Sequence, residues 1–363
     1  MKMPCVQADL GKLRDNAAAI LSSCRENGVR LAAVTKAVCA DPVIVRCLQN
    51  AGVDMLADSR VENLAVLPST LPRLSLRVSD PDEAEDIVRN AEYSLQSETG
   101  TIRALGRAAK KLEKIHRIIL MIDVGDLREG IFYKAEERIL ETVKQTLADP
   151  SLDLAGIGTN MTCFGGILPD DRNQGILLEW ANRIRQEFKV KLPIVSGGNS
   201  SSLHLLFKNR LPLGVNHLRV GEGLLLGMDT SCGQPFPNLS QEVFTVFARL
   251  IEIQDKPSLP EGSAGPNAFG ETQQFYDQGP MRRGILAIGR QDTDPMGLTP
   301  HDQAVPVIGS SSDHMIVNLT RAPQYHVGDA LLFTPNYGAL LRAYTSPYVT
   351  KRYLYENEDQ HHA

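Results

Sequence analysis

One lysine stands where a chemical role is easiest to argue. Lys36 closes the apolar run LAAVTK at residues 31–36, and lysine is almost never fully buried without a partner. The side chain could simply lie along apolar surface and carry its amine to solvent. Alternatively, desolvation would favour the neutral amine, which could attack an aldehyde to form a Schiff base and could also act as a base.

Two glycine-bearing segments have the composition of phosphate-binding turns. They are SGGNSSS at 196–202 and RVGEG at 219–223. Glycine lets the backbone approach a ligand closely, and successive N–H groups at the start of a helix bind anions. Each segment could also be only a tight turn followed by a helix cap. Taken together with Lys36, they indicate a phosphorylated aldehyde cofactor.

Arg219 ends the apolar segment 216–220. An arginine in such a place is commonly a structural residue in an ion pair. If it faces the ring nitrogen of a pyridoxal-type cofactor, it leaves that nitrogen unprotonated, because a guanidinium does not give up its proton. Such a ring is a weaker electron sink, which favours racemisation of an amino acid over transamination.

The elements that would position these residues alternate between short β-favouring runs and longer amphipathic stretches. This alternation predicts parallel strands joined by crossover helices. An open doubly wound sheet is the alternative, but no glycine-rich dinucleotide turn follows the first run. The number and spacing of the units fit a closed (β/α)8 barrel of the TIM type. The predicted strands are 31–36, 53–57, 74–78, 93–96, 118–123, 154–160, 193–196 and 216–220.

Polar residues gather at the ends of these predicted strands. In barrels of this type, chemistry takes place at the carboxyl ends of the strands, where the loops to the helices open. We therefore expect the polar strand ends to form one shared site. They are Lys36, Asp58–Arg60, Asp123–Arg128, Asn160–Cys163, Ser196–Ser200 and Arg219–Gly223.

The composition of the chain changes after residue 232, which predicts a boundary there. Residues 1–232 would form an α/β cofactor-binding barrel, and residues 233–363 a mainly antiparallel β domain. Within the second part, 255–283 is rich in proline, glycine and glutamine and reads as a long surface excursion. The β-type runs of this domain are 242–253, 284–289, 314–319, 329–334 and 339–345.

Charge and composition exclude several classes of partner. The net charge of −5 and the lack of basic clusters argue against a nucleic-acid partner. No apolar run is long enough to span a membrane, and the start of the chain lacks a signal pattern. The six cysteines are scattered, without the Cys/His spacing of a metal site, so we expect no metal, reduced thiols and a cytoplasmic location.

The motifs in combination resemble one family. The chain is similar to the ornithine racemase group of the alanine racemase superfamily, the fold-type III pyridoxal-phosphate enzymes. The resemblance covers nearly the whole chain and implies pyridoxal 5′-phosphate as cofactor and an amino acid as substrate. It also implies a head-to-tail homodimer in which the β domain completes the partner's site. The stretches that carry it are LAAVTKAVCA (31–40), ADSRVENL (57–64), MIDVGDLREG (121–130), GTNMTCFGG (158–166), PIVSGGNSSS (193–202), LRVGEGLLLG (218–227), AIGRQDTDP (287–295) and GSSSDHMIVN (309–318).

The resemblance assigns roles by position. Lys36 corresponds to the Schiff-base lysine and one of two racemising bases, and Arg219 to the partner of the ring nitrogen. The superfamily's histidine beneath the cofactor ring is replaced by Asn160. The remaining assignments are Ser200 with the backbone of Gly221 and Glu222 for the phosphate, Arg128 near the cofactor hydroxyl and the substrate carboxylate, and Asp313 in a loop that reaches across the dimer.

One departure leaves the second base open. The superfamily places a tyrosine base where this chain has Arg290, and arginine is a poor base because it does not deprotonate usefully. Asp292 is our first candidate for the second base. The others are Asp294, Cys163, His314 and Tyr337.

Carboxylates near these positions favour a basic substrate. The segment 291–294 and the pair Asp313–His314 could bind a second, cationic amine, although the segment could also be only a charged turn. Ornithine is then the leading substrate, with lysine, alanine or a broader set as alternatives. Two other classes remain open: a cofactor-binding homeostasis protein, which the attached β domain disfavours, and a D-amino-acid lyase or aldolase, for which His301 and His314 would be relevant.

Overall fold

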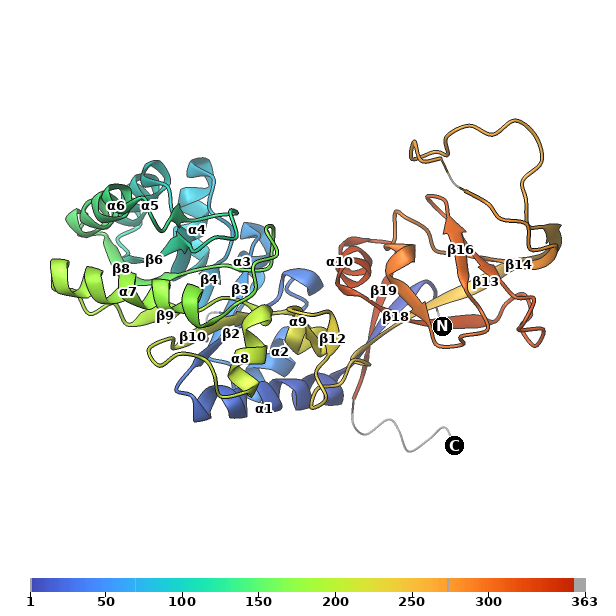
Figure 1. The fold of residues 1–363 in the computed structure, drawn as a ribbon, viewed down its shortest axis with the longest axis horizontal. Coiled ribbons are helices and arrows are strands. Elements are labelled where there is room, and N and C mark those ends of the chain that lie inside the picture. Colours follow the sequence, from blue (N-terminus) through green and yellow to red (C-terminus); the bar gives the residue numbers. More distant parts are fainter. Residues whose placement is uncertain (1, 69, 273, 356–363) are drawn as a thin grey trace. The chain divides into compact units, whose positions relative to one another are not determined.

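The computed structural model describes residues 2–68, 70–272 and 274–355, which belong to two compact units (Figure 1). The barrel unit comprises Lys12–Gln241. Of the described residues, the β unit comprises 2–11, 242–272 and 274–355. The sequence had placed the boundary after residue 232 and the whole N-terminal part in the barrel. The structure instead divides the chain at residue 241 and places the first strand in the β unit.

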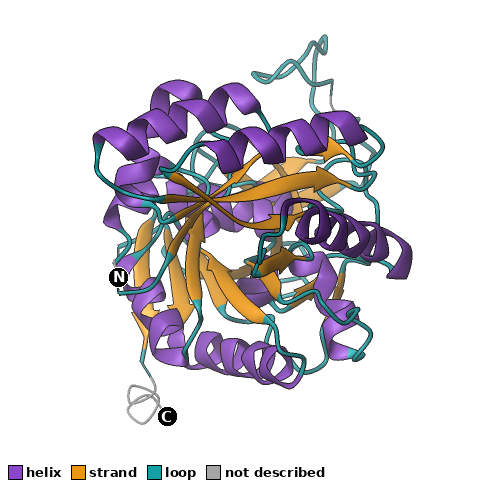
Figure 2. Ribbon diagram, turned by 90° about the vertical axis from the view of Figure 1, so that its left-hand side faces the viewer, coloured by secondary structure: helices purple, strands orange, loops and turns teal. Residues whose placement is uncertain are grey.

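Eight parallel strands close into a barrel, as predicted (Figure 2). The order around the barrel is β5-β4-β3-β2-β10-β9-β8-β6, and pairing of β5 with β6 closes it. Each predicted run overlaps one strand. The bounds are β2 Arg30–Val34, β3 Met55–Asp58, β4 Arg73–Ser75, β5 Tyr93–Gln96, β6 His116–Asp123, β8 Leu152–Gly158, β9 Ile194–Ser196 and β10 His217–Val220, with the short β7 Ile131–Phe132 added to β6.

Apolar side chains fill the inside of the barrel. Met55, Leu74, Leu95, Ile119 and Ile194 from five different strands belong to one buried cluster. Helices cover the outside of the strands (Figure 2). Because both faces of each strand are buried, the strands read in the sequence as nearly continuous apolar runs.

Two helices of the barrel unit, α2 and α7, begin at side-chain caps. Asp41 accepts hydrogen bonds from two N–H groups of α2, which has proline at its first position, and Asp170 forms a capping box with Asn173 at α7. No helix among the described residues is long and apolar enough to cross a membrane. The helices are α1 Leu10–Glu26, η1 Lys36–Val38, α2 Pro42–Ala51, α3 Val61–Val66, η2 Pro81–Glu83, α4 Ala84–Asn90, α5 Thr99–Lys111, α6 Glu136–Ala148, α7 Asp171–Phe188, η3 Ser200–Ser202, α8 Leu203–Phe207 and α9 Glu222–Leu226. A small hairpin, β11 Met228–Asp229 and β12 Gln234–Pro235, follows.

The β unit is built on a mainly antiparallel sheet, which confirms the predicted fold class. Its main path runs β15-β18-β13-β14-β17-β16, and β1 pairs with β13 and β19. The bounds are β1 Cys5–Asp9, β13 Phe244–Pro257, β14 Pro280–Leu286, η4 Pro295–Gly297, β15 Leu298–Pro300, β16 Val307–Ser310, β17 Met315–Asn318, β18 Ala330–Pro335, α10 Tyr337–Thr345 and β19 Thr350–Leu354.

One predicted strand of this unit is wrong. The run 339–345 forms most of the helix α10. Its buried residues Ala339, Leu340, Ala343 and Tyr344 recur at helical spacing, and the Asn336 side chain accepts a hydrogen bond from the Ala339 N–H at 2.9 Å. Apolar periodicity and an N-cap therefore outweigh the β-favouring composition of this short run.

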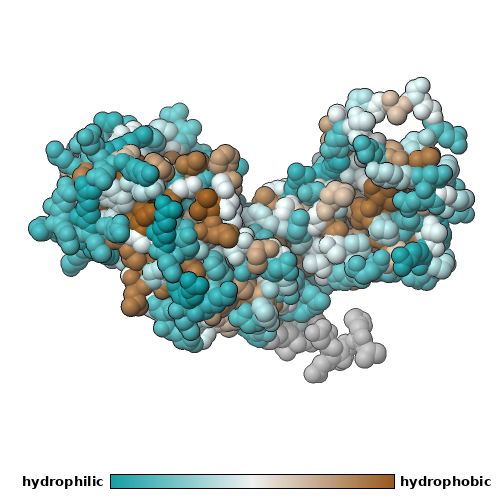
Figure 3. Space-filling model, in the orientation of Figure 1, coloured by the Kyte–Doolittle hydropathy of each residue, from teal (hydrophilic) through white to brown (hydrophobic). Residues whose placement is uncertain are grey.

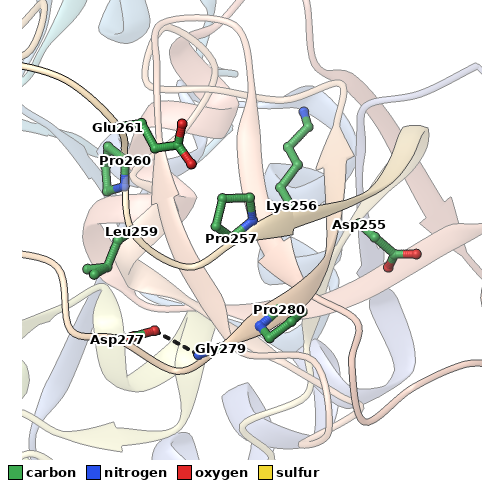
Figure 4. A pocket seen from close by; sticks show the side chains of 9 residues that line it. All are labelled: Asp255, Lys256, Pro257, Leu259, Pro260, Glu261, Asp277, Gly279 and Pro280. Atoms are coloured by element: carbon green, nitrogen blue, oxygen red, sulfur yellow. Dashed lines mark hydrogen bonds between the residues drawn. The ribbon is translucent and has the colours of Figure 1, made fainter.

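The long excursion leaves and rejoins the sheet at one place. Pro257 at the end of β13 pairs with Pro280 at the start of β14. A hollow at this base is lined by residues of both strand ends and of the excursion, among them Lys256, Leu259 and Asp277 (Figure 4). None of the site residues assigned from the sequence lines it.

Candidate functional site

Lys36 lies at the carboxyl end of β2, in the turn η1. Its side chain is half-buried, and its amine hydrogen-bonds to none of the residues that the structure describes. The preceding residue is fixed, because the Thr35 hydroxyl donates to the buried Asp58 carboxylate at 2.7 Å. β10 pairs directly with β2, with Val220 opposite Ala33. The glycine turn after β10 therefore begins beside the lysine, as the closed barrel required.

The two glycine turns meet at Ser200. The Ser200 hydroxyl accepts the N–H groups of Gly221 at 3.3 Å and Gly223 at 3.2 Å. A Cβ atom on Gly221 would lie 3.1 Å from the Cβ of Val34, a tight contact that favours glycine at this close approach. These N–H groups, with the Ser200 hydroxyl, form a cradle suited to a phosphate.

Two polar side chains lie next to the cradle, those of Ser201 and Glu222. The Ser201 hydroxyl is buried and hydrogen-bonds to none of the described residues. Burial raises the pKa of Glu222, and the positive charge of Lys36 partly offsets this. A phosphorylated aldehyde therefore fits the residues present: an unengaged lysine amine stands beside donors that suit a phosphate.

Arg219 is buried in β10 and lies among neutral acceptors. It donates to the Ser196 hydroxyl, to the Thr159 carbonyl at 2.7 Å and to the Asn160 side-chain oxygen at 2.6 Å. Burial lowers the pKa of Arg219 to about 10. The structure thus brings together Arg219 and Asn160, which the sequence had assigned to the cofactor separately.

Glu129 is a site residue that sequence reasoning missed. Its carboxylate accepts from Arg128 through Nε and through Nη2, the latter at 2.7 Å, and also from the Asn160 amide. Burial is the largest influence on the pKa of Arg128 and would lower it, but hydrogen bonding to Glu129 together with the nearby acidic groups outweighs burial and raises that pKa. The available signal was a carboxylate directly beside an arginine at a strand end, within the DLREG turn that we did quote.

Asp126 was among the polar strand ends expected at the site, but its contacts with backbone N–H groups were not predicted. Its carboxylate is buried and accepts the N–H groups of Thr162, Cys163, Phe164 and Ile167 at 3.0–3.2 Å. It therefore fixes the loop after β8 against the loop after β6. No sequence pattern marks a carboxylate that binds N–H groups of a segment about 40 residues away.

Cys163 sits on this fixed loop. Its sulfur accepts a hydrogen bond from the Asn199 amide at 3.2 Å. Burial raises the pKa of the Cys163 thiol, and the charges of Arg128 and Lys36 partly offset this rise. Among the candidates for the second base, Cys163 is one that lies in the barrel unit near Lys36.

The remaining candidates lie in the β unit. Asp292 is buried and accepts from the Gly289 N–H at 3.1 Å and the Ser346 hydroxyl at 3.4 Å. These contacts hold the Asp292 carboxylate within the turn after β14. Its role as second base stays a prediction. Asp313 accepts from the Gln291 amide and from the Ser312 hydroxyl at 2.7 Å, while His314 is exposed.

Arg290, which the resemblance sets where the superfamily has its tyrosine base, contacts the excursion. Its guanidinium forms two hydrogen bonds with Glu271 of the excursion, at 2.9 and 2.8 Å, and lies 4.2 Å from the ring centroid of Phe269. Hydrogen bonding to Arg290 lowers the pKa of Glu271 to about 2.

Tyr337, another candidate for the second base, begins α10. Among the described residues, no group of three or more His, Cys, Asp or Glu side chains could hold a metal ion.

Comparison with known proteins identifies the class of this site. A family model for the alanine racemase N-terminal domain matches residues 8–228. The chain belongs to the alanine racemase family. This confirms the resemblance drawn from its motifs.

The relatives that it matches extend over the whole chain. It is 42% identical over 353 residues to the ornithine racemase of Acetoanaerobium sticklandii, covering 97% of this chain and 99% of the relative. It is 34% identical over 356 residues to the lysine racemase of Thermotoga maritima, with coverage of 97% and 99%. Among solved structures, alanine racemase from Bartonella henselae with covalently bound pyridoxal phosphate matches with a TM-score of 0.73. That match has 16% identity and covers 98% of this chain and all of the other. At that identity the structural match establishes the fold alone.

Proposed function

We propose that this protein is a pyridoxal-phosphate-dependent racemase of a basic amino acid, with ornithine as its leading substrate. One observation carries the proposal: an unengaged lysine in the turn after β2 lies beside a phosphate cradle built from the turns after β9 and β10. The relatives named for ornithine and lysine racemisation, which match nearly the full chain, support the substrate class.

The residues of the barrel unit would hold the cofactor at three points. Lys36 would hold it covalently through its aldehyde carbon, Ser200 and the backbone of Gly221 and Glu222 would bind the phosphate, and Arg219 with Asn160 would face the ring. When bound, pyridoxal phosphate accepts the electron pair left on the α-carbon when the α-proton leaves. Arg219 keeps its own proton. It would therefore limit that delocalisation, which favours return of a proton over transfer of the amino group.

Racemisation needs a proton donor or acceptor on each face of the substrate. Lys36 removes or returns the α-proton on one face, and the half-buried setting beside Glu222 places its amine in a partly dry site. Asp292 remains our first candidate for the other face, and Cys163 is the alternative within the barrel unit. Asp313 and His314 would bind the distal amine of the substrate.

We further propose a homodimer with shared sites. Large apolar side chains are exposed on the loops after β6 and β8, including Leu127 at 64%, Phe164 at 76% and Leu168 at 50%. Apolar patches interrupt the polar surface of the barrel unit (Figure 3), and such patches favour protein contacts.

The six free cysteines support a reducing compartment, the cytoplasm.

The test is the loss of optical rotation of L-ornithine with and without a chelator. The racemase proposal requires loss of rotation with no change in amino-acid concentration and no effect of the chelator. A lyase would consume the amino acid, and a homeostasis protein would leave the rotation unchanged. Either outcome would reject the proposal.

The role of Lys36 is tested by Lys36→Ala. We expect the visible absorbance of the loaded protein to disappear and racemisation to fall by about 10³-fold or more. The control is Lys110→Ala, which removes an exposed lysine of α5 and leaves both readouts unchanged. Retention of absorbance and activity by Lys36→Ala would contradict the assignment.

A further inference from the structure

The loop between β6 and β7 carries a carboxylate that is aimed into the site. Glu129 accepts three hydrogen bonds: two come from Arg128, through Nε and Nη2, and one comes from the Asn160 amide. Its side chain is 17% exposed, against 38% for Arg128. Glu129 is therefore the more buried partner of the pair, and it contacts Asn160 of the site.

This carboxylate connects the two arginines of the site. Asn160 donates to Glu129 with its amide nitrogen and accepts from Arg219 with its amide oxygen, at 2.6 Å. A continuous line of hydrogen bonds thus runs from Arg128 through Glu129 and Asn160 to Arg219. The negative charge of Glu129 also offsets the effect of burial on Arg219 by raising its pKa.

The Arg128 guanidinium is engaged along one edge only. Glu129 takes the edge formed by Nε and Nη2. An arginine carries five N–H donors in a rigid planar fork. The opposite edge, formed by Nη1 and the second hydrogen of Nη2, makes no hydrogen bond to the described residues. That edge has the geometry that binds a carboxylate through two hydrogen bonds.

The backbone around Glu129 is fixed before any ligand binds. Gly130 has φ +120°, and a Cβ atom there would lie 2.6 Å from the Asp123 backbone nitrogen. The Asp123 side chain accepts the N–H groups of Gly125 at 2.8 Å and Leu127 at 3.2 Å. Asp126 ties the same loop to the loop after β8. Glu129 is therefore held rigidly enough to orient the flexible side chain beside it.

We infer that Glu129 is a positioning residue that holds Arg128 by one edge so that its free edge binds the α-carboxylate of the substrate. This inference rests on the proposed function for the kind of substrate. It excludes direct contact between Glu129 and the distal amine. Glu129 acts through Arg128, and the link to Asn160 and Arg219 aligns the carboxylate-binding edge with the cofactor end of the site.

Binding of three related ligands to the cofactor-loaded protein separates these roles. L-Ornithine has an α-carboxylate and a distal amine, L-norvaline lacks the distal amine, and 1,4-diaminobutane lacks the carboxylate. Calorimetry on Glu129→Gln is expected to show at least tenfold weaker binding of ornithine and norvaline, by similar factors. Binding of diaminobutane should stay within twofold of the parent protein.

Two further variants keep the test specific. Glu129→Asp retains the charge and should recover part of the affinity for both carboxylate ligands. The double variant Arg128→Lys with Glu129→Gln should bind ornithine no more weakly than Arg128→Lys alone, because Glu129 acts through Arg128. The control is Glu98→Gln, which breaks the exposed Glu98–Arg138 pair on the same unit and should change no affinity.

Three results would overturn the inference. Weaker binding of diaminobutane but not norvaline by Glu129→Gln would place the distal amine at Glu129. Additive losses in the double variant would show that Glu129 acts independently of Arg128, and unchanged affinities would show no role in binding. A protein that binds ornithine with this pattern but does not racemise it rejects the proposed function alone, whereas one that binds none of the three ligands rejects both.

Discussion

Asp58 fixes the residue that precedes Lys36. Its buried carboxylate accepts from the Thr35 hydroxyl at 2.7 Å, from the N–H groups of Ser59 and Arg60 at 2.7 and 3.0 Å, and from the Asn63 amide at 3.0 Å. Burial raises the pKa of Asp58, while these hydrogen bonds act in the opposite direction. The Asp58 carboxylate therefore links Thr35, the residue before Lys36, to the start of α3.

Removal of the Asp58 carboxylate should lower the stability of the folded protein. We expect Asp58→Ala to lower the free energy of unfolding by roughly 3 kcal/mol, because it leaves several donors without a partner in a buried place. Asp58→Asn has nearly the same shape and keeps an oxygen for three of the donors, so it should cost about 1 kcal/mol. Urea unfolding measures both. Equal costs for the two variants would contradict this account.

Two barrel strands begin with a buried histidine. His116 opens β6 and lies 2.8 Å from the Ser94 hydroxyl of β5, and His217 opens β10 and lies 2.7 Å from the Ser196 hydroxyl of β9. Burial lowers the pKa of His116 to about 4 and that of His217 to about 3. Both rings are neutral in the folded protein at neutral pH, and for His217 the nearby positive charge of Arg219 also favours the neutral ring.

These histidines predict loss of stability in mild acid. Below the unfolded-state pKa of about 6.5 the unfolded chain binds protons that the folded barrel does not, so stability falls as pH decreases toward the folded-state values. Between pH 6.5 and 5 each histidine should cost about 2 kcal/mol. Urea unfolding of the parent and of His116→Gln measures this, and the variant should show a shallower decline. Equal pH dependence in both proteins would count against the prediction.

Element by element, the sequence was most informative where both faces of a strand are buried. All eight barrel strands could be located because runs such as 118–123 and 154–160 are continuously apolar, and glycine turns marked the cradle. β1 was missed because its partners, β13 and β19, are far away in the sequence. The run 339–345 was too short for composition to separate a strand from a helix.

The site was predictable only in part for a related reason. Lys36, Ser200 and Arg219 stand at strand ends, which the barrel brings together by its topology. Glu129 and Asp126 act through contacts between two loops. Such contacts depend on the path of the backbone, which residue types alone do not define.

On the scale of the whole molecule, the exposed loops after β6 and β8 predict assembly. Leu127→Lys and Phe164→Lys place charges on apolar side chains that are 64% and 76% exposed. If a second copy covers this surface, the variants should become monomeric in light scattering and lose racemase activity while they still bind the cofactor. The control Val66→Lys changes another exposed apolar residue, 70% exposed on α3. A parent protein that is monomeric at micromolar concentration would reject the dimer.

The pairing of β1 sets an order of events during synthesis. β1 lies between β13 and β19. Its Cys5 pairs with Phe247 of β13 on one side and with Thr350 of β19 on the other. All eight barrel strands leave the ribosome before β13 does. The barrel can therefore close first, while β1 has no partner until β13 and β19 have been synthesised. Until then its edges are unpaired and open to other strands. In the nascent protein, β1 is therefore made before the barrel strands but pairs only after them.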